Sequence, residues 1–400
     1  MYKNEKFKRL IFLVEIHFSK VEYEFFGIDF LQSQGFDVEV WDFTNYIQPN
    51  IPATIVSSYN YSNLWQLHKV FSNKDQVQKA FARLGRSSFI VSYLTYSSAS
   101  LFVYKIMAKC KLPYALVSRN QMPLFFYDDS ISFLKRMLNV CGSRFFARLE
   151  SFIMRKIPYF ILRVRAADFL FLDVQRVGII SPVGKGTKVI YHHSPDYDYY
   201  LLELAKNKKN SSSDNLAIFL DQYIPFHHDF LCIEGNYSFD VKEYYLLLRN
   251  FFNYLEIKYK IKIIIALHPR AEQQERKGWF GNREVIKNNT VELVSNCQFV
   301  MAHFSTAISY AVLFKKPLLF LKTTHFLNNR LDKYCQMLAR YLGSSLVNIS
   351  TPKEYCKVDI MSNLNVDVEL YENYKSKYIK YPGTKDTLFW QNFIEQIKKY

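Results

Sequence analysis

The sequence contains 400 residues and carries a formal net charge of +16, because 52 Lys and Arg outnumber 36 Asp and Glu. At roughly 150 residues per domain, this length favours two or three domains over one small fold. Hydrophobic residues make up 49% of the chain and charged residues 22%, which excludes disordered, collagen-like and coiled-coil proteins.

The first half of the chain alternates strands with helices. Apolar or alternating runs predict the strands, and apolar residues at helical spacing predict the helices. The predicted strands are 9–14, 36–43, 88–94, 114–118, 168–173 and 187–191, and the predicted helices are 19–34 and 98–110. Such alternation implies a parallel sheet that is covered on both faces.

Two segments of this half differ in composition. Residues 132–165 are rich in Lys and Arg, interleaved with apolar side chains. This pattern suits contact with an anionic membrane surface or an anionic acceptor, and a solvated helix face explains it equally well. The polar tract at 206–214 predicts an interdomain linker.

Past this tract the alternation restarts. The predicted strands are 216–221, 261–267, 299–302 and 317–321, and the predicted helices are 240–258, 305–314 and 387–400. We therefore expect an α/β fold with two Rossmann-like domains that face a cleft, over residues 1–205 and 215–400. The amphipathic helix at 387–400 can pack back across the first domain.

Neither export nor a membrane span is predicted. The apolar run near the N-terminus is interrupted by Glu15 and His17, and no small-residue cleavage site follows. No run of about 18 uninterrupted apolar residues occurs. The six cysteines lie far apart without a CxxC pair, which is typical of reduced thiols and argues against a zinc site. We therefore expect a cytoplasmic protein.

A histidine follows a buried strand in the second half. The apolar run at 263–267 ends in His268-Pro269-Arg270, and ligands of open α/β sheets bind beyond the carboxyl ends of the strands. An Arg fork suits a phosphate, and an imidazole can give an oxyanion a hydrogen bond or a proton. In the alternative interpretation, Arg270 pairs with a surface acid such as Glu272, and His268 is an ordinary loop residue.

Two hydroxyl residues follow the next predicted strand, 299–302. Ser305 and Thr306 occupy the position of N-cap residues before a helix that ends at 315–317. Hydroxyls and free backbone N–H groups at a helix N-terminus form an anion site. An ordinary cap without a ligand is the alternative.

This pair of motifs resembles the nucleotide-binding motifs of bacterial sialyltransferases and polysialyltransferases of the GT-B fold, and of related capsule and lipopolysaccharide transferases that use CMP-activated sugars. The match covers about 268–321. The resemblance implies an acceptor-side first domain and a nucleotide-sugar-binding second domain. It also implies that His268, Ser305 and Thr306 contact the nucleotide phosphate, with 269–270 beside them, and that His268 takes part in catalysis.

The acidic motif of that family, two acidic residues followed by Gly, is missing, and the nearest strings are at 128–130 and 221–222. A transferase still needs a carboxylate or His that accepts the proton of the acceptor hydroxyl. Three acids compete for this role: Glu15, Asp221 and Asp229. Position at strand ends favours Glu15 and Asp221.

The sequence therefore predicts a cytoplasmic glycosyltransferase of surface-polysaccharide synthesis. It would transfer an acidic CMP-activated sugar, such as a sialic, pseudaminic or Kdo-like one, to a glycan or lipid-linked acceptor without a metal or other cofactor, with 132–165 near the membrane.

Two alternatives remain. Asp196-Tyr197-Asp198 could hold a metal for a UDP- or GDP-sugar, although acids also suit the first turn of a helix. A non-catalytic basic protein could bind membranes or nucleic acid. The scattered basic residues and the lack of a known module argue against nucleic acid.

Overall fold

The computed structural model describes residues 7–48, 66–118, 157–173, 182–206, 215–226, 240–269, 271, 278–324 and 330–400, with the backbone alone described for Val21 and Arg330. The chain folds into two compact units. Unit 1 contains the described residues of 7–193 together with 384–400, and unit 2 contains those of 194–383. The chain therefore enters unit 2 and returns to unit 1.

Unit 1 is built on a seven-stranded parallel sheet with the order β3-β2-β1-β4-β5-β6-β7. Its strands are β1 (Arg9–Val14), β2 (Asp37–Asp42), β3 (His68–Val70), β4 (Ser88–Ser92), β5 (Tyr114–Val117), β6 (Phe169–Leu172) and β7 (Lys188–Tyr191). Its helices are α1 (Lys20–Phe25), α2 (Ile28–Ser33), α3 (Thr44–Ile47), α4 (Lys74–Ala82), α5 (Ser98–Lys109) and α16 (Phe389–Ile397).

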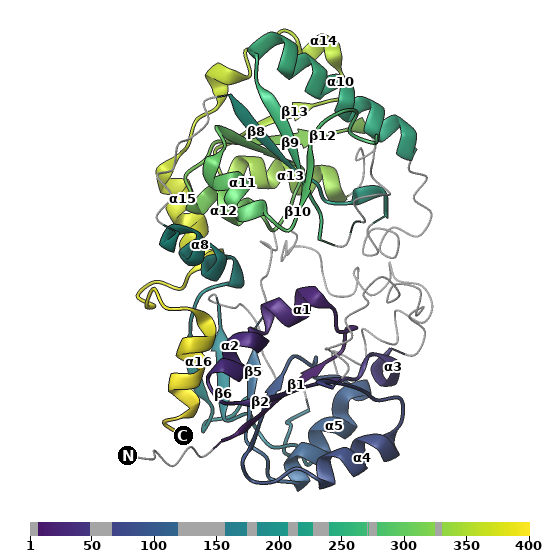
Figure 1. Ribbon diagram of the computed structural model, residues 1–400, viewed down its shortest axis with the longest axis vertical. Helices are drawn as coiled ribbons and strands as arrows, with labels where there is room; N and C mark the ends of the chain where they lie inside the picture. The colour runs from purple at the N-terminus through teal and green to yellow at the C-terminus, as the bar shows by residue number, and fades with distance from the viewer. Residues whose placement is uncertain are drawn as a thin grey trace. The chain divides into compact units, whose positions relative to one another are not determined.

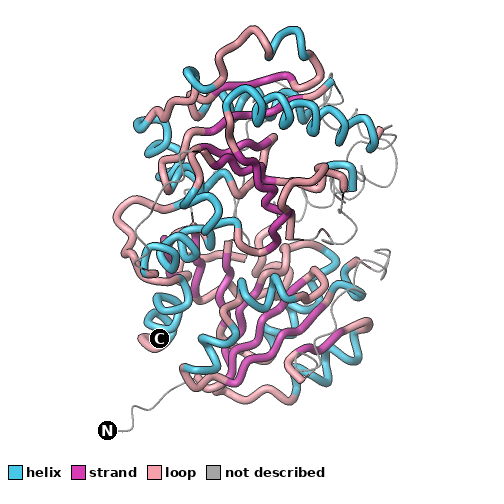
Figure 2. The backbone as a smooth tube through the Cα atoms, turned by 45° about the horizontal axis from the view of Figure 1, so that its top comes forward, coloured by secondary structure: helices cyan, strands magenta, loops and turns pink. Residues whose placement is uncertain are grey.

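The central strand β1 shows why the apolar runs of this unit are continuous. Leu10 and Phe12 belong to the core beneath α16, whereas Ile11 and Leu13 belong to the core beneath α4 and α5. Successive side chains of a strand point to opposite faces, so a strand that is covered on both faces is apolar at every position. Figure 2 shows the strands with helices around them.

The helix predicted at 19–34 is two helices, α1 and α2, because the chain turns between them at Gly27. Gly27 adopts a left-handed backbone with φ 56°. A Cβ atom at this position would lie 2.4 Å from Cδ1 of Trp390. Gly27 thus provides both the turn and the space for the α16 side chain above it.

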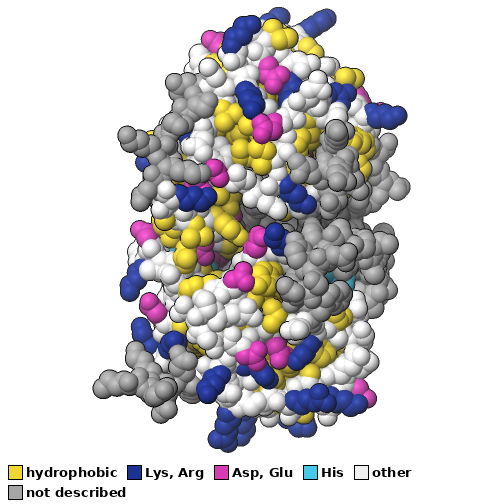
Figure 3. Space-filling view, viewed as in Figure 1, with side chains coloured by type: hydrophobic (Ala, Val, Ile, Leu, Met, Phe, Trp, Pro, Cys, Tyr) yellow, Lys and Arg dark blue, Asp and Glu magenta, His cyan; other side chains and the backbone are white. Residues whose placement is uncertain are grey.

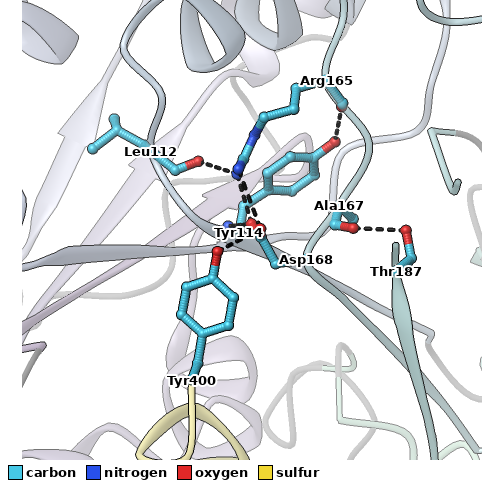
Figure 4. Close-up of polar contacts among 7 residues, drawn as sticks. All are labelled: Leu112, Tyr114, Arg165, Ala167, Asp168, Thr187 and Tyr400. Atoms are coloured by element: carbon cyan, nitrogen blue, oxygen red, sulfur yellow. Dashed lines mark hydrogen bonds and ion pairs between the residues drawn. The ribbon is translucent and has the colours of Figure 1, made fainter. Parts of the chain in front are cut away.

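Helix α16 packs on unit 1, beside α2 (Figure 1). Trp390 donates a hydrogen bond from Nε1 to the carbonyl of Phe25 at 3.0 Å. At the amino end of β6, Asp168 accepts hydrogen bonds from Nη2 of Arg165 (2.6 Å) and the hydroxyl of Tyr400 (2.8 Å), as Figure 4 shows. Residues 384–400 are therefore an integral part of the first α/β unit.

Unit 2 is built on a six-stranded parallel sheet with the order β10-β9-β8-β11-β12-β13. Its strands are β8 (Leu216–Leu220), β9 (Lys262–Leu267), β10 (Val285–Lys287), β11 (Phe299–Ala302), β12 (Leu318–Lys322) and β13 (Ser345–Asn348). Its α-helices are α8 (Pro195–Ala205), α10 (Val241–Tyr259), α11 (Thr290–Asn296), α12 (Ile308–Leu313), α13 (Arg330–Tyr341), α14 (Pro352–Tyr355) and α15 (Val368–Tyr374). Short 3-10 turns η2 (Ile224–Phe226) and η5 (Met361–Asn363) and a π-turn η6 (Lys375–Ile379) complete it.

The units divide the chain at 193 rather than at the expected position 205. Helix α8 belongs to unit 2 because it packs against α11 and α12. The helix expected to close the second domain, α16, belongs to unit 1. Most of the expected linker, 207–214, and most of the basic segment, 132–156, lie outside the described residues.

No helix in the described part of the chain is long and apolar enough to cross a membrane. On the face drawn in Figure 3, the described Lys and Arg side chains are spread over the surface and interspersed with Asp and Glu. The positive net charge is therefore not gathered into one stripe on this face.

Candidate functional site

The carboxyl edge of the unit 2 sheet collects the residues that the sequence analysis singled out in this half. His268 follows β9, Asp221 follows β8, and Ser305 and Thr306 lie shortly after β11. These strands are adjacent in the order β9-β8-β11. Because β8 pairs with β9 on one side and β11 on the other, the strand order reverses here, which is where open α/β sheets bind ligands.

Three consecutive residues after β8 tie these loops together. Tyr223 donates its backbone N–H to Oδ1 of Asp221 at 3.1 Å and adopts a left-handed backbone with φ 56°. Gln222 accepts the backbone N–H of Phe304 through Oε1 at 2.7 Å. The Tyr223 ring lies nearly parallel to that of His268, at 8° with 6.2 Å between centroids. The β8 loop thus contacts both the β9 and the β11 loops.

A buried histidine supports the same edge from below. His303 directly follows β11 and is fully buried, with Nε2 2.9 Å from the hydroxyl of Tyr244 and Nδ1 2.6 Å from the carbonyl of Leu321. Burial disfavours the imidazolium and lowers the pKa of His303 to about 4. His303 is therefore a neutral, structural residue at pH 7.

The expected N-cap position of Ser305 and Thr306 is wrong. Helix α12 begins only at Ile308, its N-cap residue is Ala307, and no side chain caps it. Ser305 Oγ instead accepts the backbone N–H of Ala307 at 3.2 Å. Tight turns precede the helix here, because the backbone N–H groups of 308, 309 and 310 each bond to the carbonyl three residues earlier. Ser305 is half-buried and Thr306 is exposed.

The other predicted residues of unit 2 have different outcomes. His268 is half-buried and Pro269 is exposed, whereas Arg270 and Asp229 lie outside the described residues. Asp221 is buried, and its carboxylate forms the turn described above. Asp196 lies in the first turn of α8. Burial of Tyr310 raises the pKa of its hydroxyl, and the negative charge of Asp196 and its hydrogen bond to that hydroxyl act in the same direction.

The carboxyl edge of unit 1 presents a different set of groups. Glu15 follows β1, and its two carboxylate oxygens accept the backbone N–H (3.0 Å) and the hydroxyl (2.5 Å) of Thr95, which follows β4. Because β1 and β4 are neighbours at the point where the strand order of this sheet reverses, the Glu15 carboxylate bridges the switch point of unit 1.

Beside it lies a carboxylate flanked by two imidazoles, a cluster that no sequence pattern predicts. Asp42, the last residue of β2, is fully buried, and its Oδ1 accepts the N–H (2.8 Å) and hydroxyl (2.5 Å) of Thr44. Its Oδ2 lies 3.3 Å from Nε2 of His68 and 3.6 Å from Nδ1 of His17. Burial acts to raise the pKa of Asp42, but the hydrogen bonds from His68 and Thr44 outweigh it and lower the pKa.

One buried nitrogen of this cluster has no hydrogen-bond partner within the described residues. Nε2 of His17 makes no hydrogen bond within the described residues, while Nδ1 faces the Asp42 carboxylate. An imidazole held by a carboxylate on one nitrogen can accept a proton on the other. No group of three His, Cys, Asp or Glu side chains in the described part of the chain is arranged to hold a metal ion.

The similarity of this chain to known proteins was found in the structure and not in the sequence. No protein-family model matches the chain, and no curated protein matches its sequence. The structure of the wall teichoic acid polymerase TagF, H444N variant, matches 99% of this chain and 90% of its own, at 13% identity and a TM-score of 0.50. MurG from Acinetobacter baumannii matches 98% of this chain and 100% of its own, at 10% identity and a TM-score of 0.46.

A further match is Anabaena Alr3699/HepE in complex with UDP-glucose, over 98% of this chain and 100% of its own, at 12% identity and a TM-score of 0.44. At these identities the likeness concerns the fold alone. The strand orders of the two units, together with the TagF match, confirm the predicted fold class of two Rossmann-like α/β domains of the GT-B type.

Proposed function

We propose that this chain is a nucleotide-sugar-dependent glycosyltransferase of bacterial surface-polysaccharide synthesis. The observation that carries the proposal is the placement of His268 after β9 and of Ser305 and Thr306 after β11, the two strands that flank β8 at the switch point of unit 2. An imidazole, two hydroxyls and loop N–H groups are donors that suit a phosphate. The fold shared with a teichoic acid polymerase is consistent with a polysaccharide role.

The donor in this proposal is a CMP-activated acidic sugar. The support is the resemblance of the His268-Pro269 and Ser305-Thr306 pair to the motifs of CMP-sugar transferases. The alternative DxD string is less suited to a metal, because Asp196 is hydrogen-bonded to Tyr310. His268, Ser305 and Thr306 would hold the phosphate, with Arg270 adjacent in sequence.

The reaction needs a base that accepts the proton of the acceptor hydroxyl. That oxygen forms the new bond to the anomeric carbon, and the bond from this carbon to the phosphate oxygen breaks, so that the nucleotide leaves with the electron pair. The edge of unit 1 offers two bases, Glu15 and the His17–Asp42 pair. We favour His17, because both oxygens of Glu15 already accept hydrogen bonds from Thr95.

The proposed location is the cytoplasmic face of the membrane. The net charge of +16 attracts both a nucleotide sugar and anionic lipid. Phe160 and Ile161 are 66% and 62% exposed at the end of the basic segment, where they can insert among headgroups. Arg165 of the same segment is committed to Asp168 instead.

A thermal-shift titration with CMP, UDP, GDP and ADP, with and without Mg²⁺, tests the donor assignment. Ligand that binds the native state raises the melting temperature, and we expect a selective rise with CMP that does not depend on Mg²⁺. A Mg²⁺-dependent response to UDP or GDP would favour the alternative in which Asp196 and Asp198 hold a metal for a UDP- or GDP-sugar. No response to any nucleotide would contradict the proposal.

Two variants test the site itself. His268→Ala and a Ser305/Thr306 double-alanine variant should fold and lose nucleotide affinity, because each removes donors to the phosphate. Unchanged affinity in both would refute the site. Transfer activity should be assayed as nucleotide release in the presence of acceptor glycans.

A further inference from the structure

Gln222 occupies the centre of the unit 2 edge and was not singled out by its sequence context. It lies two residues after β8, between the strand that ends before His268 and the strand that precedes Ser305. Its side chain is only 8% exposed. A long polar side chain that is this buried at a switch point needs hydrogen-bond partners.

The hydrogen bond between the Gln222 side chain and Phe304 orients the amide group of Gln222. The backbone N–H of Phe304 is a donor, so the atom facing it at 2.7 Å is the carbonyl oxygen Oε1. The amide Nε2 with its two N–H groups then lies on the other arm of the side chain. Nε2 makes no hydrogen bond within the described part of the chain.

The neighbouring residues hold this side chain in place. Asp221 accepts the Tyr223 N–H and thereby fixes the left-handed turn after Gln222. Tyr223 packs its ring against His268. Asp221 and Tyr223 are therefore positioning residues on either side of Gln222, and the bond from Phe304 fixes Gln222 itself from the β11 loop.

We propose that Gln222 is a nucleotide-contacting residue, whose Nε2 amide donates a hydrogen bond to a phosphate oxygen of the nucleotide bound at this edge. The inference rests on the proposed function. It adds a neutral donor between His268 and Ser305, at the place where an extra charge would have to be desolvated. A neutral amide gives the phosphate a hydrogen bond without a counter-charge of its own.

The substitution Gln222→Glu tests this most directly. Glutamate keeps an acceptor for the Phe304 N–H but replaces the Nε2 donor by a carboxylate oxygen. We expect the melting temperature to stay close to that of the wild type and the affinity for CMP to fall at least tenfold, while the affinity for cytidine, which lacks the phosphate, stays within twofold. Isothermal titration calorimetry gives both affinities.

Two further variants separate the hydrogen bond from charge and folding effects. Gln222→Met is uncharged and of similar size, so it should also lower the ratio of CMP to cytidine affinity, even if the Glu variant unfolds. Thr324→Glu adds the same charge to an exposed position after β12 and should leave this ratio nearly unchanged.

The outcomes distinguish this inference from the function on which it rests. If the wild type binds CMP and both Gln222 variants keep the wild-type ratio of CMP to cytidine affinity, the role of Gln222 is refuted and the nucleotide site stands. If Thr324→Glu lowers the ratio as much as Gln222→Glu and Gln222→Met does not lower it, the effect is one of charge and the inference is also refuted. If the wild type binds no nucleotide, both fail together.

Discussion

The two units share a strand order over six strands, to which unit 1 adds β7, but they present different chemistry at their carboxyl edges. In each unit, the first strand (β1 or β8) is followed by a side chain that accepts hydrogen bonds. The donors lie in the loop after the neighbouring strand at the switch point (β4 or β11). In unit 1 the acceptor is the carboxylate of Glu15, bonded to Thr95. In unit 2 it is the neutral amide of Gln222, bonded to Phe304.

In the proposed function, this difference suits the two similar frameworks to opposite tasks. Glu15 and Asp42 make the unit 1 edge rich in carboxylates, which repel phosphate but suit the removal of a proton from a neutral hydroxyl. Amide, imidazole and hydroxyl groups dominate the unit 2 edge, where the buried Asp221 carboxylate accepts a backbone N–H. In this proposal the topology sets where a ligand would bind, and the loop side chains set which ligand it would be.

The largest effect is expected at the unit 1 edge. His17→Gln should reduce turnover by about 10²- to 10⁴-fold, the usual contribution of a general base, and leave nucleotide affinity unchanged. Glu15→Gln should reduce it less, since Glu15 is engaged by Thr95. Asp221→Asn, which keeps an acceptor for the Tyr223 N–H, serves as the control on unit 2. Steady-state kinetics measures the turnover of each variant. A larger loss of turnover in Asp221→Asn than in His17→Gln would place the general base on the unit 2 edge instead.

Acid should destabilise each unit through a buried imidazole whose pKa is lowered, His192 in unit 1 and His303 in unit 2. Burial lowers the pKa of His303 to about 4 and that of His192 to about 3. Below pH 6.5 the unfolded chain takes up these protons and the folded chain does not, so stability is complete above pH 6.5 and falls toward the folded-state pKa. Between pH 7 and pH 5 each imidazole should cost about 2 kcal/mol.

Urea unfolding at the two pH values measures this loss. His303→Gln and His192→Gln should each remove part of it. Asp42 should contribute nothing in this range, because its lowered pKa matters only below the usual aspartate range near pH 4. A stability that is independent of pH between 7 and 5 would exclude neutral burial of both imidazoles.

A smaller effect on stability is expected where the C-terminal helix α16 packs on unit 1. Gly27→Ala places a Cβ against Trp390 and keeps a left-handed backbone, so we expect a loss of about 2 to 4 kcal/mol. Gly35→Ala is the matched control, with φ 87° and open space around the Cβ, and should cost about 1 kcal/mol. Thermal unfolding that shows equal losses would contradict the packing of α16 on this turn.

The smallest effect is expected for the hydrogen bonds between Glu15 and Thr95 at the switch point of unit 1. Thr95→Val removes the hydroxyl that bonds to Glu15 but keeps the backbone N–H, which should cost about 1 kcal/mol. Gln222→Ala is the corresponding change in unit 2 and should cost a similar amount. A difference of several kcal/mol in urea unfolding would show that the two bridges are not equivalent.

The sequence was sufficient to locate the buried strands and the edge strand β7, and insufficient for the other three edge strands. The predicted strands 9–14 and 299–302 coincide with β1 and β11, because strands covered on both faces are continuous apolar runs. Strands β3, β10 and β13 were not predicted. They are short and lie at or near sheet edges with partly exposed side chains, so neither an apolar run nor clear alternation marks them.

The same limit applies to the sites. His268, Ser305 and Thr306 were found because they follow apolar strands. The His17–Asp42–His68 cluster was missed, because residues 17, 42 and 68 meet only through the pairing of β1 with β2 and β2 with β3. Gln222 carried no sequence signal either, since its partner Phe304 is 82 residues away.

The return of α16 to unit 1 has a consequence for the order in which the chain folds during synthesis. Unit 2 is complete once residue 383 has left the ribosome, whereas unit 1, although begun first, lacks α16 until residues 384–400 follow. Until then Phe12 and the Gly27 turn have no Trp390 to cover them. The first unit to be translated is therefore the second to be finished, and its apolar sheet face has to be kept from aggregation while unit 2 is made.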